Sequence, residues 1–243
     1  MLPDERGLAP AGRPASERAS ATDHRPRDLT FARARRARVR HISTNREDHR
    51  GGMNKGRLEA FSDGVMAILI TIMVLELKIP HESGVGALLP LVPVFLSYAL
   101  SYVYLGIYWN NHHHMLHATS RINGTILWAN LHLLFWLSLV PFVTGWMGEN
   151  HFAATPTAVY GGVLLAAAIA YYLLQSAIIA DQGPSSRLAV AVGKDLKGKI
   201  SPVLYMSAIP LAFFREWIAG AIYVAVALMW LVPDRRIEKR IGE

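Results

Sequence analysis

RLEAFSDGVMAILITIMVLELKIP, residues 57–80, decides the fold of this chain. The segment is long and apolar enough to cross a membrane, yet it opens with Arg57, Glu59, Ser62 and Asp63. Ionisable groups at membrane depth are costly, and they usually face a bundle interior or a water path instead of lipid. The segment therefore predicts a membrane helix whose polar first turns face other helices or a water path.

The composition is that of a membrane protein. The 243 residues carry a formal net charge of +7 and include no Cys, which excludes disulfides and thiolate metal sites. The mean hydropathy is +0.23, and the apolar residues gather in long blocks instead of alternating. Windows of about 18 or more mostly apolar residues are typical of membrane helices. The sequence therefore predicts an all-α membrane protein.

The first 52 residues differ from the rest. They hold twelve Arg and seven Asp or Glu and show no apolar period, so we expect a disordered, basic cytoplasmic tail. The basic run FARARRARVR (residues 31–40) leaves anionic-lipid or nucleic-acid binding as an alternative, although we expect no nucleic-acid partner. No apolar run of signal-peptide length occurs here. Met53 is an alternative translation start, so this end is interpreted as either a tail or an over-extended gene prediction.

Residues 53–243 are predicted to form one domain of six transmembrane helices. The apolar blocks place these helices at about residues 57–79, 86–110, 123–146, 157–180, 200–214 and 216–232. Pro90 and Pro93 fall in the first turns of the second helix, and Pro141 predicts a kink in the third. The fifth and sixth helices are nearly continuous, which predicts a tight turn at residues 214–217.

Lys and Arg are distributed unevenly between the two sets of loops. Residues 1–52, 110–121, 185–199 and 234–240 form the more basic set, and residues 81–84, 148–155 and 215–216 form the other. Cytoplasmic loops carry an excess of Lys and Arg. Both termini are therefore expected in the cytoplasm, in agreement with an even number of spans.

Apolar side chains form a stripe along the first helix. Gly64, Ile68, Ile72, Leu75 and Ile79 are spaced by three or four residues, which puts them on one helix face. Thr71 lies beside this stripe, whereas Asp63 points elsewhere. The simplest interpretation is a face packed on lipid or on neighbouring helices, with the Thr71 hydroxyl bonded to its own backbone.

The polar residues at the start of the first helix need partners. Burial of Arg57, Ser62 and Asp63 is tolerable only where each group is paired. We expect the hydroxyl and the carboxylate to bond side chains of the next helices and to hold the first helix in register. A proton relay is the alternative.

Histidines cluster at the end of the second helix, in WNNHHHMLH (residues 109–117). His113 and His117 share one helix face at a spacing that can bind zinc, but no Cys or obvious carboxylate lies near them. We therefore expect a histidine hydrogen-bonded to Asp63 or Ser62, and His132 bonded in the same way to Asn130. No metal or cofactor is expected. Because GxSxG, HExxH and phosphate-loop motifs are absent, we do not expect an enzyme.

These residues resemble the transmembrane protein 175 family, which contains lysosomal potassium channels and shorter prokaryotic relatives. The specific match is R-x-x-x-F-S-D-G, formed by Arg57, Phe61, Ser62, Asp63 and Gly64. Weaker matches are Trp109, His112 and His113 in W-x-x-H-H, Asn130, PFVT at residues 141–144, and PDRRIE at residues 233–238. The resemblance covers about residues 54–238, and the first 52 residues show no counterpart in it.

The resemblance implies a homotetramer of six-helix chains with the first helix lining a central pore. Ile68 would form the main constriction, Thr71 would contribute to cation selectivity, and Ile72 with Leu75 would continue the apolar lining. No TVGYG filter motif is present. The implied activity is a leak-type cation channel of the plasma membrane, weakly selective for K⁺ over Na⁺, in which apolar side chains form the gate.

The resemblance also implies a structural clamp around the pore helix. Phe61, Ser62 and Asp63 would hold this helix against the second and third helices. The expected partners are Trp109, His112 or His113, and Asn130, while Arg57 would shape the cytoplasmic mouth or pair with Glu59 or Asp63. Near the other mouth, Glu76 would attract cations or pair with Lys78.

Two further classes of function remain as alternatives. A proton-linked secondary transporter would use Asp63 and the histidines, although the broken helices of many transporters are not obvious here. A membrane enzyme or a structural subunit ranks last, because no catalytic set is present.

Overall fold

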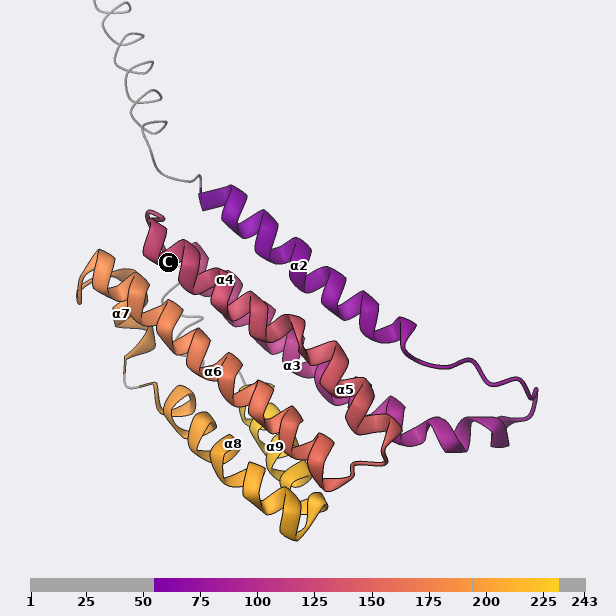
Figure 1. The fold of residues 1–243 in the computed structure, drawn as a ribbon. Coiled ribbons are helices and arrows are strands. Elements are labelled where there is room, and N and C mark those ends of the chain that lie inside the picture. The colour runs from indigo at the N-terminus through magenta and orange to yellow at the C-terminus, as the bar shows by residue number, and fades with distance from the viewer. Residues whose placement is uncertain (1–54, 194, 232–243) are drawn as a thin grey trace, which may run out of the picture. The chain divides into compact units, whose positions relative to one another are not determined.

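The computed structural model describes residues 55–193 and 195–231, and these residues form helices and connecting segments without strands. Predictions about residues 1–52, Met53 and the PDRRIE segment lie outside the described residues. The helices are α2 (Lys55–Leu75), η1 (Val85–Leu91), α3 (Val92–His117), α4 (Gly124–Ser138), α5 (Val140–Glu149), α6 (Ala154–Gln182), α7 (Arg187–Val192), α8 (Leu196–Phe214) and α9 (Glu216–Leu231) (Figure 1). The predicted all-α class is confirmed.

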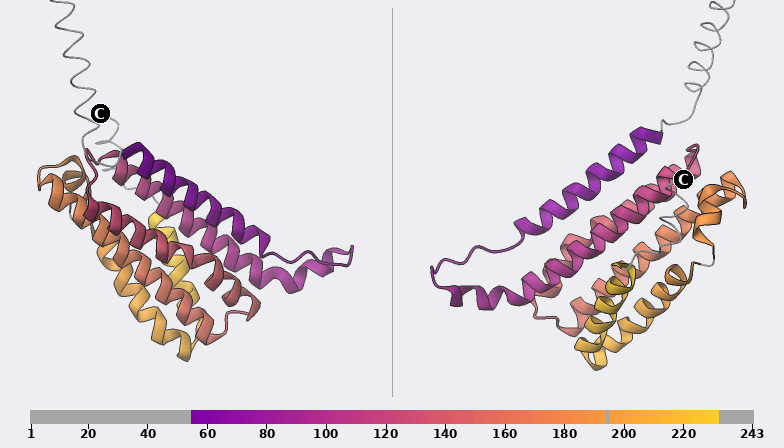
Figure 2. Two further views of the ribbon diagram at one scale, coloured as in Figure 1. Left: turned by 45° about the horizontal axis from the view of Figure 1, so that its top comes forward. Right: turned by 180° about the vertical axis from the view of Figure 1, so that it is seen from behind.

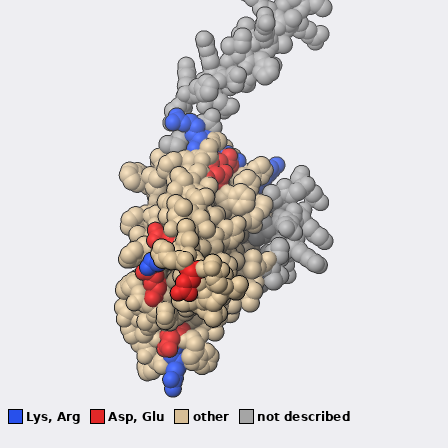
Figure 3. Space-filling view, turned by 90° about the vertical axis from the view of Figure 1, so that its right-hand side faces the viewer, with Lys and Arg blue, Asp and Glu red and all other residues tan. Residues whose placement is uncertain are grey.

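Four helical segments are long and apolar enough to cross a membrane: Lys55–Leu75, Val85–His117, Gly124–Glu149 and Ala154–Gln182. They correspond to the first four predicted spans. The regions predicted as fifth and sixth spans are α8, of 19 residues, and α9, an apolar helix of 16 residues. Most of the face shown in Figure 3 is uncharged, and its charged side chains gather in small groups.

The α2 helix packs on α3, α4 and α5, and α6 packs on α4, α5, α8 and α9 (Figure 2). Buried hydroxyls join the inner helices. Thr144 Oγ1 lies 2.6 Å from Ser101 Oγ, which lies 3.0 Å from the Tyr160 hydroxyl. Such pairs satisfy polar groups that would be costly if buried alone. These bonds connect α3, α5 and α6 at the centre of the bundle.

Prolines set two of the breaks, as the sequence predicts. The third predicted span is divided into α4 and α5 at Leu139, because Pro141 has no backbone N–H to donate to the preceding turn. The second span begins as a 3₁₀ helix that contains Pro90 and continues as α3 with Pro93 in its first turn. The tight turn before α9 is also confirmed, since only Arg215 separates α8 from α9.

Two helix ends differ from the prediction. The first helix ends at Leu75 instead of residue 79, so Ile79 is not part of its helical stripe. Leu77 N–H donates to the Val74 carbonyl in a closing turn, and Pro80 favours an extended backbone before it. Lys78 forms an ion pair with Glu149 (2.7 Å), so the pair with Glu76, one of the two alternatives for Glu76, is not formed. Glu149 raises the pKa of Lys78.

The second helix continues to His117, seven residues beyond its predicted end. Its polar last turns are stabilised by local contacts that a hydropathy pattern does not reveal. Asn111 Nδ2 donates to the Ile107 carbonyl, and the rings of His113 and His117 stack at a 14° interplanar angle. The fifth helix also starts earlier, at Leu196, because Asp195 caps it by accepting a hydrogen bond from Gly198 N–H.

We predict that Gly148→Ala destabilises the protein by about 1–3 kcal/mol, because overpacking forces the backbones apart. A Cβ at Gly148 would lie 2.7 Å from Val94 Cα, where α5 crosses α3. Gly145→Ala is the matched control, since a Cβ there meets nothing within 4 Å. Thermal unfolding in detergent measures both variants. Equal melting temperatures would contradict the close crossing.

Candidate pore helix and its polar anchor

The α2 helix has one buried face and one exposed face. Leu58, Ser62, Met66, Leu69 and Met73 are buried, at the spacing of one helix stripe. The opposite side carries the residues predicted to line a pore. Gly64, Thr71 and three large apolar residues are exposed there: Ile68 (57%), Ile72 (40%) and Leu75 (79%). One chain therefore leaves this apolar face, with its single hydroxyl, uncovered.

The Thr71 hydroxyl lies on the exposed side but is not without a partner. Its Oγ1 donates to the Ile68 carbonyl at 2.9 Å, as the simplest interpretation of the sequence expected. Because the hydroxyl hydrogen is used in this bond, the oxygen lone pairs are left for an external donor or a cation.

A chain of three buried polar side chains connects α2, α4 and α3. Asn130 Nδ2 donates to Ser62 Oγ at 3.0 Å, and Asn130 Oδ1 lies 2.6 Å from His112 Nε2. Since the amide oxygen only accepts, His112 Nε2 carries the hydrogen in this bond. All three residues are buried, with 0–1% exposure. His112 Nδ1 is left buried without a hydrogen-bond partner within the described part of the chain.

A second set of contacts joins α2 to α3 directly. Trp109 Nε1 donates to Asp63 Oδ1 at 3.0 Å, and Lys55 Nζ donates to the His117 carbonyl at 2.8 Å. The ring of His113 stacks on Trp109, with centroids 6.0 Å apart. Together these contacts join the first turns of α2 to the last turns of α3.

We call the contacts of Ser62, Asp63 and Lys55 with α3 and α4 the anchor of α2. Some residues of the R-x-x-x-F-S-D-G motif do not take part in it. Phe61 is 51% exposed, and Gly64 has open space where a Cβ would lie. Arg57 is exposed, and the ion pairs among the described residues do not include it. Glu59 pairs with Lys55 instead, at 3.7 Å. Arg57, Phe61 and Gly64 therefore face away from the helices that hold Ser62.

His132 does not bond Asn130, contrary to the expectation from the sequence. Its Nε2 accepts from Trp136 Nε1 at 2.9 Å, one turn along the same helix. The amide of Asn130 is already used by Ser62 and His112. Among the described residues no group of three His, Asp, Glu or Cys is placed to hold a metal ion.

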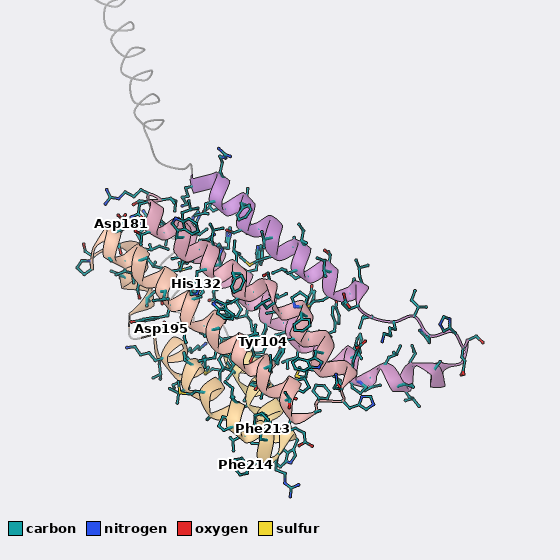
Figure 4. The ribbon with its side chains drawn as sticks, viewed as in Figure 1. Tyr104, His132, Asp181, Asp195, Phe213 and Phe214 are labelled. Carbon is teal, nitrogen blue, oxygen red and sulfur yellow. The ribbon has the colours of Figure 1, made fainter. Side chains whose placement is uncertain are left out.

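Two features were not found from the sequence. The Lys55 bond to a backbone carbonyl carries no sequence signal, because the acceptor is not a side chain. The other is a cavity of about 50 Å³ lined by residues of α3, α6, α8 and α9 and by Asp195. Two of its lining residues, Tyr104 and Asp195, are labelled in Figure 4. Its tyrosines are spread over residues 104–205, and only the fold brings them together.

Residues 57–141 match the family described as the endosomal/lysosomal potassium channel TMEM175. A potassium channel of Chryseobacterium sp. is 54% identical over 191 residues, which cover 79% of this chain and 100% of that protein. A potassium channel of Chamaesiphon minutus is 33% identical over 187 residues, which cover 71% of this chain and 91% of that protein.

A solved structure is similar as well. The crystal structure of a lysosomal potassium-selective channel TMEM175 homolog from Chamaesiphon minutus has 31% sequence identity and a TM-score of 0.66. The matched region covers 73% of this chain and 96% of the chain in the crystal structure.

We predict that Asn130→Leu lowers the free energy of unfolding by about 2–4 kcal/mol, because two buried partners lose their hydrogen bonds at about 1–3 kcal/mol each. The matched control is Asn150→Leu, since Asn150 is exposed and its Nδ2 donates to the Trp146 carbonyl of its own helix. Denaturant or thermal unfolding in detergent measures both variants.

A double-mutant cycle with Ser62→Ala tests the same bond. Coupling of about 0.5–3 kcal/mol between the two substitutions is expected for residues in direct contact. Strictly additive effects would show that Ser62 and Asn130 do not act together.

Proposed function

This chain belongs to the family of the endosomal/lysosomal potassium channel TMEM175, and we propose that it forms a tetrameric, leak-type potassium channel. Four copies would surround one axis, with residues 53–243 as the channel domain and the α2 helices lining the pore. Closed fourfold symmetry gives identical contacts around such a pore. The channel would be weakly selective for K⁺ over Na⁺ and would have no enzymatic activity.

The exposed face of α2 is the observation that carries this proposal. Ile68, Ile72 and Leu75 are uncovered in one chain, while the other side of the same helix is buried on α3, α4 and α5. Relatives called potassium channels match this chain over their full or nearly full length. Four uncovered α2 faces turned toward one axis would form a continuous pore lining.

Ile68 is proposed as the constriction of this pore. A ring of four isoleucine side chains offers no oxygen atoms to replace the hydration shell of an ion. Such a ring gates by expelling water, so that a small tilt or rotation of α2 opens it. Ile72 and Leu75 continue the apolar lining beyond the constriction.

Thr71 is proposed as the selectivity layer. Because its hydroxyl hydrogen is bound to the Ile68 carbonyl, its oxygen can present lone pairs to a partly dehydrated cation. Four such oxygens favour K⁺ only modestly, since K⁺ loses its water more easily than Na⁺ and the hydroxyls coordinate it weakly.

The anchor is proposed to set the position of the pore helix. Ser62 and Asp63 bond side chains of α4 and α3, and these bonds fix the rotation of α2. The proposed clamp also includes the other residues of the two motifs, which are Arg57, Phe61, Gly64 and His113. Arg57 would lie at the cytoplasmic mouth. We place the channel in the plasma membrane with both termini in the cytoplasm.

Passive cation flux in proteoliposomes tests the proposal. Flux that is faster with K⁺ than with Na⁺ and needs no proton gradient is expected. Saturable flux that requires a proton gradient and is abolished by Asp63→Asn would instead favour the proton-linked transporter. A stable monomer in mild detergent would contradict the tetrameric pore.

We predict that Ile68→Asn increases K⁺ flux and reduces the K⁺/Na⁺ flux ratio, because four amides hydrate the proposed constriction. Ile169→Asn is the matched control, since Ile169 is an exposed isoleucine of α6. It should leave flux and selectivity unchanged. Equal effects of the two variants would contradict a constriction at Ile68.

We predict that Thr71→Val lowers the K⁺/Na⁺ flux ratio toward 1, because it removes the oxygen while nearly keeping the side-chain shape. Thr71→Ser, which keeps the hydroxyl, should retain most of the preference for K⁺. The ratio comes from parallel flux assays in the two salts. An unchanged ratio in Thr71→Val would exclude the hydroxyl layer.

A further inference from the structure

We propose that the cavity lined by α3, α6, α8, α9 and Asp195 binds a primary ammonium group, such as the headgroup of phosphatidylethanolamine. This site is separate from the proposed pore face of α2, because no α2 residue lines the cavity. Four observations carry the proposal: the charge of the lining, its aromatic content, its hydrogen-bonding capacity and its position along the helices.

The charge and the aromatic content of the lining favour a cation. Asp195 is the single Asp or Glu among the lining residues, and they include no Lys, Arg or His. Six aromatic side chains contribute to the lining: Tyr104, Tyr108, Tyr171, Tyr172, Tyr205 and Trp230. Aromatic faces attract ammonium groups, more strongly where water is excluded. A cation therefore suits this cavity better than a phosphate or a carboxylate does.

The side-chain amide of Gln175, which makes no hydrogen bond within the described part of the chain, also lines the cavity. Gln175 is only 6% exposed. An amide offers one hydrogen-bond acceptor and two donor hydrogens. Since the amide borders this cavity, a molecule inside it can supply a partner.

Several hydrogen-bond donors of the cavity lining already donate to other protein groups. The Tyr104 hydroxyl donates to the Tyr223 carbonyl at 2.6 Å, and Trp230 Nε1 donates to Ser201 Oγ at 2.9 Å. Ser201 in turn donates to the Lys197 carbonyl at 2.8 Å. Oxygen lone pairs of Tyr104 and Asp195 are left, together with the Gln175 amide oxygen. The Asp195 carboxylate, which only accepts, and the Gln175 amide oxygen suit a ligand that donates hydrogen bonds. The Tyr108, Tyr172 and Tyr205 hydroxyls can both donate and accept.

The size and position of the cavity fit a lipid headgroup. A volume of about 50 Å³ holds roughly three to five waters, or an aminoethyl group, which consists of two carbons and one nitrogen besides its hydrogens. Asn111 and Gln175 lie within about two turns of the ends of α3 and α6. Asp195, labelled in Figure 4, caps the start of α8. The site is therefore toward one end of the spanning helices, where lipid headgroups would lie if these helices cross a bilayer. A trimethylated ammonium is larger and has no N–H to donate.

Native mass spectrometry of the delipidated full chain in detergent tests this site. Phosphatidylethanolamine should bind about tenfold or more tightly than phosphatidylcholine with the same acyl chains, because only the former donates N–H bonds. Equal binding of the two lipids would overturn the proposal.

Variants locate the binding. Gln175→Leu and Asp195→Asn should each weaken phosphatidylethanolamine binding about tenfold, since each removes a partner of the ammonium. Asparagine also caps helices, so Asp195→Asn keeps the start of α8. Gln182→Leu, the same change on the same helix outside the cavity, should bind as the natural chain does. Unchanged binding in both cavity variants would overturn the proposal, and Asp195→Asn decides alone if Gln175→Leu does not fold.

Ethylammonium chloride distinguishes a free amine from a lipid. Its displacement of bound phosphatidylethanolamine would show that the cavity accepts the ammonium group itself, and KCl at the same concentration is the control. Lipid that ethylammonium does not displace, but that Asp195→Asn releases, would identify the whole headgroup as the ligand. Equal displacement by KCl and ethylammonium would overturn the ammonium assignment. These measurements do not depend on ion flux.

Discussion

The fold of this chain depends on one buried hydrogen-bonded chain, Ser62–Asn130–His112, which joins α2, α4 and α3. In a lipid environment an unpaired polar group is expensive, so each of these side chains requires the other two helices to be in place. Asn130 is suited to the centre because its amide donates at one atom and accepts at the other. Any rotation of α2 about its axis would break the Ser62 bond.

The same constraint determines what α2 presents outward. Successive residues turn by about 100°, so a helix fixed at Ser62 also has fixed directions for Ile68, Thr71 and Leu75. The polar residues at the start of α2 and the apolar residues that follow them therefore have related roles. Polar groups on one face hold the helix to its own chain, and the opposite face stays uncovered. In the proposed channel, this uncovered face is what four copies share.

Hydropathy and proline positions predicted much of the fold. The apolar blocks identified the helices, Pro141 identified the break between α4 and α5, and the turn at Arg215 was also predicted. The end of α3 was missed because hydropathy falls there, while local bonds and ring stacking continue the helix. The end of α2 was placed too late, because apolar residues continue beyond Leu75 and only the turn and Pro80 stop the helix.

The candidate site was predictable only in part. Periodicity separated the two faces of α2. The motif included Ser62 and Asp63 of the anchor, but also Arg57, Phe61 and Gly64, which face away from it. The expected bond from a histidine to Asp63 or Ser62 was wrong, because Trp109 bonds Asp63 and Asn130 bonds Ser62. His112 bonds Asn130 instead, and since His112 and His113 are neighbours, only packing decides which of them is buried. The predicted bond between His132 and Asn130 was also wrong. The amide of Asn130 has few bonding atoms, and Ser62 and His112 use them.

Cysteine modification tests the proposed pore lining most directly, because the natural sequence contains no Cys. Thr71→Cys in proteoliposomes would be exposed to a positively charged methanethiosulfonate while K⁺ flux is recorded. Val203→Cys, an exposed position of α8, is the control. We expect the reagent to block flux through Thr71→Cys and to leave Val203→Cys unaffected. Flux that continues in Thr71→Cys after verified modification, or that is blocked equally at both positions, would contradict a pore lined by α2.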